Sequence, residues 1–121
     1  MTSTLGEEVR SVAARAALGV PGVAALQPVL ADRLAAAAAL VRHGSGAAAH
    51  PVVAGIRTER VRDDGWDVEV RCVLYDGHRV VDVARQVREQ VRAAVSAHLA
   101  RLGSPATVSV RVTVTRTVVD T

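Results

Sequence analysis

The sequence predicts an α+β domain of two layers, with helices on one face of a three-stranded mixed sheet and the element order α-α-β-β-α-β. Two observations favour this fold. The chain of 121 residues contains 24 Val and 22 Ala, and Val favours strands whereas Ala favours helices. Apolar residues also recur with period two in some segments and with helical spacing in others. We expect a single domain over residues 1–121, with a helical part at 1–50 that includes a loop at 43–51, and a β-β-α-β part at 52–121.

Two helices are expected before the first strand. The first spans residues 5–18, because apolar residues lie near one stripe and charged residues mostly away from it. Gly and Pro interrupt helices, so the segment 19–23 should end it. The second helix should start at Pro28, since Pro suits a first helical turn, and continue to about residue 42. The predicted buried stripe of the first helix is Leu5, Val9, Val12, Ala16 and Leu18.

A hairpin is predicted next, formed by strands at residues 52–62 and 66–75. Asp63, Asp64 and Gly65 supply its turn. The second strand alternates cleanly, which is typical of an antiparallel strand with one face in a core. One face of this strand carries Val68, Val70, Cys72 and Leu74, and the other carries Asp67, Glu69, Arg71 and Val73.

The clearest helix of the chain follows Asp76, Gly77 and His78 and should end at Gly103. Its predicted buried stripe is Val80, Ala84, Val87, Val91, Val95, His98 and Leu102. A last strand at 107–119 should place Val108, Val110, Val112 and Val114 inward. A right-handed crossover makes it parallel to the strand at 66–75. The sequence leaves open whether it lies beside the first or the second strand of the hairpin.

The titratable residues do not suggest an active site, and we assign no catalytic, cofactor-binding or metal-binding residue. His43 and His50 flank a Gly/Ala-rich loop without a nearby carboxylate or thiol to complete a metal site. His98 should be partly buried with a backbone or water partner. Cys72, the single cysteine, is expected to be a small core residue. We therefore predict that the protein is not an enzyme.

All fifteen basic residues are Arg, the net charge is +3, and the charges are spread along the chain. This pattern indicates a solvated surface of mixed sign. The first ten residues do not resemble a signal peptide. Gly and Pro interrupt the longest uncharged run, so no membrane-spanning helix is expected. The expected location is the cytoplasm.

Three stretches together resemble a known family. They are residues 12–26 followed by Pro28, the alternating segment 68–77, and the amphipathic helix 81–95 with the strand 108–114. Their order and spacing are similar to the alkaline shock protein family, also called the Gls-type envelope stress response family, in an Arg-rich form like that of actinobacterial members. The resemblance implies a cytoplasmic, non-enzymatic stress response protein that needs no cofactor. It also implies self-assembly, and attachment to the inner face of the cell membrane through a small membrane-anchor protein or a paralogue.

The open edges and the polar face of the predicted sheet are the expected protein-interaction surface. Its residues are Glu69, Arg71, Arg111, Thr113, Arg116, Val118 and Val119.

An alternative interpretation is a KH-like nucleic-acid-binding domain. It would use the GxxG corner at residues 19–22 and the long helix's Arg85, Arg88 and Arg92. Pro21 lacks the N–H that a phosphate would bind, and the chain offers only two aromatic residues for base stacking. We therefore expect protein partners, among them further copies of this chain, rather than nucleic acid.

Overall fold

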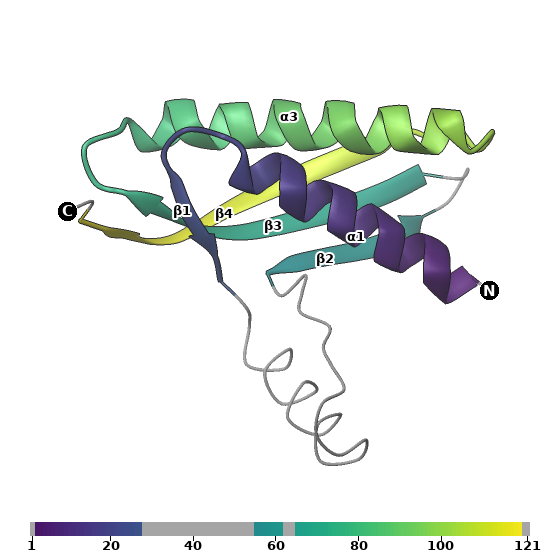
Figure 1. The fold of residues 1–121 in the computed structure, drawn as a ribbon, viewed down its shortest axis with the longest axis horizontal. Coiled ribbons are helices and arrows are strands. Elements are labelled where there is room, and N and C mark those ends of the chain that lie inside the picture. The colour runs from purple at the N-terminus through teal and green to yellow at the C-terminus, as the bar shows by residue number, and fades with distance from the viewer. Residues whose placement is uncertain (1, 28–54, 62–64, 120–121) are drawn as a thin grey trace, which may run out of the picture.

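The computed structural model describes residues 2–27, 55–61 and 65–119 (Figure 1). The predicted second helix, the loop at 43–51 and the turn residues Asp63 and Asp64 lie outside these ranges. The described elements, in chain order, are α1 (Thr2–Leu18), β1 (Val23–Leu26), β2 (Ile56–Val61), β3 (Gly65–Tyr75), α3 (Val80–Arg101) and β4 (Val108–Val118). The α+β class is confirmed.

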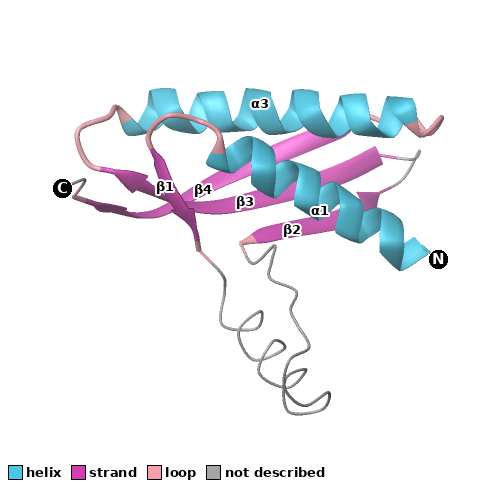
Figure 2. Cartoon of the chain, viewed as in Figure 1, coloured by secondary structure: helices cyan, strands magenta, loops and turns pink. Residues whose placement is uncertain are grey.

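Within the described residues the sheet has four strands rather than the predicted three, and β3 is its centre (Figure 2). On one side β3 pairs in parallel with β4 along nearly its whole length. On its other side β3 pairs antiparallel with β2 through its first half and with β1 through its second half. The mixed sheet and the parallel last strand agree with the prediction. The last strand lies beside the second strand of the predicted hairpin.

The sequence prediction missed β1 because its four residues, Val-Ala-Ala-Leu, show no alternation, and three of them are good helix formers. Its pairing with β3 forms this strand. Val23 lies opposite Leu74, Leu26 lies opposite Cys72, and the Tyr75 N–H donates to the Gly22 carbonyl at 2.8 Å. Tertiary hydrogen bonding therefore outweighs local propensity in this segment.

The core lies between the sheet and the two described helices, which cover the same face of the sheet. The predicted inward residues of β3 are all buried, and those of β4 pack against them. From the helices, the core takes residues spaced by four: Val9, Ala13 and Ala17 of α1, and Val83, Val87, Val91, Val95 and Leu99 of α3.

The predicted stripes of both helices were therefore partly wrong. Leu18 and Leu102 are half exposed, and Val80 is 41% exposed, because these end positions lie off the buried row. In α1 the fully buried residues are Val9, Ala13 and Ala17, while Leu5, Val12 and Ala16 of the predicted stripe are partly buried against the core. His98 is partly buried as expected, but its partner is a side chain rather than a backbone group or water, because its Nε2 lies 3.0 Å from the Glu8 Oε1 and thus links α3 to α1.

A β-bulge interrupts β4 near its end. Val114 pairs with Cys72 and Arg116 pairs with Val73, so Thr115 is an extra residue. The Thr115 hydroxyl donates to the Cys72 carbonyl at 3.3 Å. Because paired residues of parallel strands share a face, the bulge places Arg116 on the side of the sheet away from the helices.

Candidate interaction surface

The sheet face turned away from α1 and α3, here called the outer face, carries the polar side chains of three strands. Strand alternation and register place eight polar residues on it: Arg57, Glu59, Asp67, Glu69, Arg71, Ser109, Arg111 and Thr113. Five of them are exposed, whereas Glu69, Arg71 and Thr113 are partly buried. Neither α1 nor α3 covers this face. Val73, which alternation also places on it, is only 3% exposed, so the open part of the face is the part that carries the five exposed residues.

Charges on the outer face form two neighbouring rows across the strands. The basic row consists of Arg57, Glu69 and Arg111, and its two positive charges and one negative charge sum to +1. The acidic row consists of Glu59, Asp67 and Ser109, and its two negative charges sum to −2. Like charges directly opposite one another in a sheet are unfavourable. Glu59 and Asp67 therefore gain when a cation from another molecule approaches them.

A hollow of about 350 Å³ on the outer face touches both rows. It is open to solvent, and charged residues from β2, β3 and β4 supply most of its lining. Small-molecule sites are usually enclosed and lined by apolar side chains. This hollow therefore resembles part of a protein contact surface more than a ligand pocket.

The predicted interaction residues are largely brought together. Glu69, Arg71, Arg111 and Thr113 share the outer face, and the bulge adds Arg116 and Val118 to it. Val119 follows β4 and is 70% exposed. The prediction did not include Arg57 and Glu59, although their two-residue spacing in an expected strand was a usable signal.

Arg71 has a structural role that the other outer-face residues lack. Its N–H donates to the Gly55 carbonyl at 2.9 Å, and its carbonyl accepts from the Gln27 N–H at 2.8 Å. Its Nε atom is buried and makes no hydrogen bond within the described part of the chain. Arg71 thus connects the ends of β1 and β2 through its backbone groups, which a substitution of its side chain would keep.

Of the alternative nucleic-acid surface, only Arg85 lies beside the GxxG corner, where it lines a hollow together with Gly19 and Pro21. Arg85 also shares a hollow beside β4 with Arg88, and Arg88 shares another there with Arg92.

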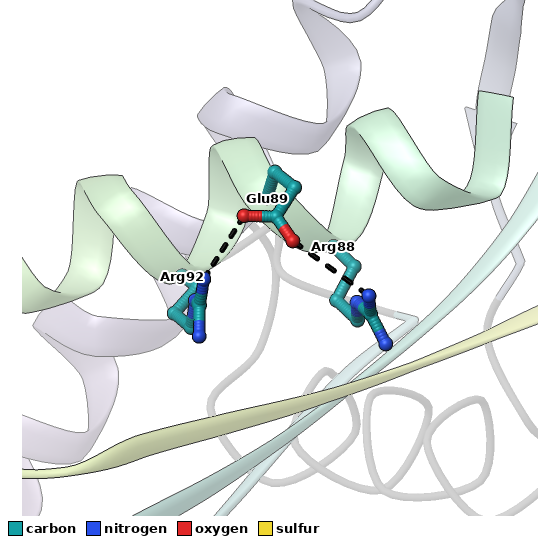
Figure 3. Close-up of polar contacts among 3 residues, drawn as sticks. All are labelled: Arg88, Glu89 and Arg92. Atoms are coloured by element: carbon teal, nitrogen blue, oxygen red, sulfur yellow. Dashed lines mark hydrogen bonds and ion pairs between the residues drawn. The ribbon is translucent and has the colours of Figure 1, made fainter. Parts of the chain in front are cut away.

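A carboxylate lies between these two arginines. Glu89 Oε1 is 3.0 Å from Arg92 Nη2, and Glu89 Oε2 is 3.7 Å from Arg88 Nη2 (Figure 3). The alternative surface is therefore not purely basic.

The residue types that most often act in catalysis or metal binding form no reactive site in the described part of the chain. Burial raises the pKa of the Cys72 thiol above its ordinary value of 9.0, which disfavours the reactive thiolate at neutral pH. Within residues 2–27, 55–61 and 65–119, no cluster of three His, Cys, Asp or Glu side chains could hold a metal ion. His43 and His50 are outside the described residues.

The fold and this surface define the class of protein as a two-layer α+β domain with an open, charged sheet face. Comparison of the chain with protein-family models, curated proteins and solved structures gave no match. Neither described helix combines the length and the apolar character needed to cross a membrane.

Proposed function

We propose that this protein is a non-enzymatic interaction module that self-associates through the outer face of its sheet. The observation that supports this proposal is the basic row lying directly beside the acidic row on an exposed face. A two-fold axis running across the strands between the rows brings the basic row of one protomer over the acidic row of its partner. In this arrangement Arg57 meets the partner's Glu59, Glu69 meets the partner's Asp67 and Arg111 meets the partner's Ser109. The symmetry repeats each contact, so the Arg57–Glu59 pairs are favourable, whereas the Glu69–Asp67 pairs join like charges.

We propose the envelope stress response as the setting, on the strength of the three stretches that resemble the alkaline shock protein family. In that setting the assembly is a cytoplasmic scaffold at the inner face of the cell membrane. A small membrane-anchor protein or a paralogue holds it there. Because the two facing rows carry net charges of +1 and −2, the association weakens as salt increases.

The self-association is tested by sedimentation velocity over a concentration series at about 50 mM and about 500 mM NaCl. We expect reversible association that is stronger at low salt. Arg57→Glu and Glu59→Arg each place like charges across the two-fold axis, and each should weaken association at least about tenfold. The matched control is Glu7→Arg, which makes the same charge change as Glu59→Arg at an exposed position of α1.

Mixing the two variants is the sharper test. In a heterodimer of the Arg57→Glu and Glu59→Arg chains, both cross-axis contacts again join opposite charges. We expect the mixture to associate as strongly as the original protein, although each variant alone does not. A mixture that stays monomeric, or an original protein that is monomeric at all concentrations, would contradict the proposal.

The nucleic-acid alternative is supported only by the hollow that Arg85 shares with the GxxG corner. It predicts binding of single-stranded RNA that falls steeply with salt. Fluorescence anisotropy with a labelled RNA near physiological ionic strength tests it, and absence of binding there removes it.

A further inference from the structure

The side of β4 that faces away from β3 is a free edge. Among the described strands, β4 pairs with β3 alone. The Thr107 carbonyl accepts from the Trp66 N–H at 2.8 Å, so the odd-numbered residues of the following segment direct their backbone groups toward β3. The backbone N–H and C=O groups of the even-numbered residues therefore point away from the sheet; these residues are Val108, Val110, Val112 and Val114.

A groove runs between this edge and α3, and we call it the α3–β4 groove. It consists of two hollows that share Arg88 and Val110. The first is lined by Val81, Ala84, Arg85, Arg88, Val110, Arg111 and Val112. The second is lined by Arg88, Glu89, Arg92, Val108, Ser109 and Val110. The two elements lie alongside one another (Figure 1), so the groove follows the free edge.

The lining of the groove combines apolar and basic side chains. Val81 is 63% exposed, and Ala84 and the β4 valines extend the apolar part. Four arginines border the groove, and against Asp82 and Glu89 of α3 they leave a formal charge of +2. The Glu89 carboxylate forms ion pairs with both Arg88 and Arg92, so it neutralises two guanidinium groups only in part. The side chains of Arg88 and Arg92 are each more than half exposed.

The spacing of these arginines fits a strand. Arg88 and Arg92 are four residues apart, which corresponds to about 6 Å along the helix axis. Side chains on one face of a strand repeat at about 6.6 Å. Two acidic residues at alternate positions of a strand beside β4 would therefore reach both arginines.

We propose that the α3–β4 groove binds an extended acidic peptide, which adds to the free edge of β4 as a further strand. The free edge supplies the backbone hydrogen bonds, and the arginines select the acidic side chains. The inference rests on the proposed function only in requiring that the protein bind other chains. It uses a different surface from the contact between Arg57 and Glu59, so one can fail without the other.

A peptide accounts for this groove better than RNA does. The backbone groups of the free edge match the donors and acceptors of another strand. None of the residues that line the groove is aromatic, so base stacking is not provided. Glu89, between two of the arginines, would also repel phosphates.

The test uses fluorescence anisotropy with a labelled ten-residue peptide in which Glu alternates with Thr. A peptide with Lys in place of Glu is the charge control. We expect Arg88→Gln and Arg92→Gln each to weaken binding roughly three- to tenfold, because each removes one partly screened charge contact. Glu89→Gln should strengthen binding roughly threefold, because it removes the competing carboxylate.

A proline substitution separates strand addition from simple charge attraction. Val110→Pro removes an N–H that β3 does not use but an added strand needs. We expect Val110→Pro to bind the peptide at least about tenfold more weakly than the matched Val110→Ala, which loses apolar side-chain atoms as well but keeps the N–H. Circular dichroism verifies that both variants fold. The same test can be made with the unaltered protein and an acidic peptide whose alternate backbone amides are N-methylated. This peptide should bind at least about tenfold more weakly than the unmethylated one.

Three results would overturn the inference: no binding of the acidic peptide, equal binding of the N-methylated peptide, or tighter binding of a single-stranded RNA of equal charge. The peptide titration is repeated with the Glu59→Arg chain, in which self-association is weakened. Unchanged binding of the peptide to the Glu59→Arg chain supports the inference. This holds even if the original protein proves monomeric and the proposed self-association fails.

Discussion

We expect a side chain at Gly55 to destabilise the fold. Comparison with Gly77 separates the cost of the backbone conformation from the cost of close contacts. Gly55 has φ +93° and is buried at the start of β2. A Cβ atom there would lie 2.9 Å from the Leu26 Cβ and 3.0 Å from the Gln27 backbone nitrogen. Gly77, in the turn after β3, has a similar φ of +96°, but a Cβ atom there would have no atom within 4 Å.

Both alanine substitutions therefore force a non-glycine residue into a positive-φ conformation. Only Gly55→Ala also brings the new Cβ atom too close to neighbouring atoms. The left-handed conformation costs a non-glycine residue about 1–2 kcal/mol. The Gly55 site adds displacement of a neighbouring strand, which we estimate at about 1–3 kcal/mol by analogy with overpacked cores. We expect Gly77→Ala to lower the free energy of unfolding by about 1 kcal/mol and Gly55→Ala by about 3 kcal/mol.

Urea unfolding followed by the fluorescence of Trp66, the single tryptophan, measures both values. The comparison is informative because the difference between the variants isolates the approach of β1 to the start of β2. Equal destabilisation by the two substitutions, within about 0.5 kcal/mol, would show that this close approach is not present in the folded protein.

Three further predictions concern the core and its helix contacts. Because burial raises the pKa of Cys72, the folded protein retains a proton that the unfolded chain loses above about pH 9. The free energy of unfolding should therefore fall as pH rises beyond that value. Urea unfolding of Cys72→Ala should show a weaker decline with pH. Val91→Ala should lower the free energy of unfolding by about 2 kcal/mol because Val91 is fully buried, whereas Val81→Ala, at a 63% exposed site, should change it by less than about 0.5 kcal/mol. A double-mutant cycle of His98→Ala and Glu8→Ala should give a coupling below about 1 kcal/mol, since the Glu8 side chain is 44% exposed, and a larger value would show that water screens the contact poorly.

Local periodicity was sufficient to predict β3, α3 and β4. Each has at least eleven residues with a regular apolar repeat, and each was placed to within two residues at either end. The rotation of a helix about its axis was harder to predict. Val80 and Leu102 fit an apolar stripe as well as Val83 and Leu99 do, and only packing against α1 and the sheet selects the second pair.

Part of the interaction surface could also be predicted from the sequence. Alternation assigned Glu69 and Arg111 to the polar face of the sheet. Their placement in one row with Arg57 depends on strand register, which alternation alone does not determine. The facing of Arg116 depends on the bulge at Thr115, and no sequence pattern indicated that extra residue.

The bulge also limits how far a neighbouring strand can follow β4. Before Thr115, odd-numbered residues direct their backbone groups toward β3; after it the phase is reversed, because the Val118 carbonyl accepts from the Asp76 N–H. A continuous ladder on the outer edge can therefore extend over residues 108–114 and no further. Thr115 thus limits the length of the strand that can pair with the outer edge of β4. It also opposes the unlimited edge-to-edge growth that leads to fibrils.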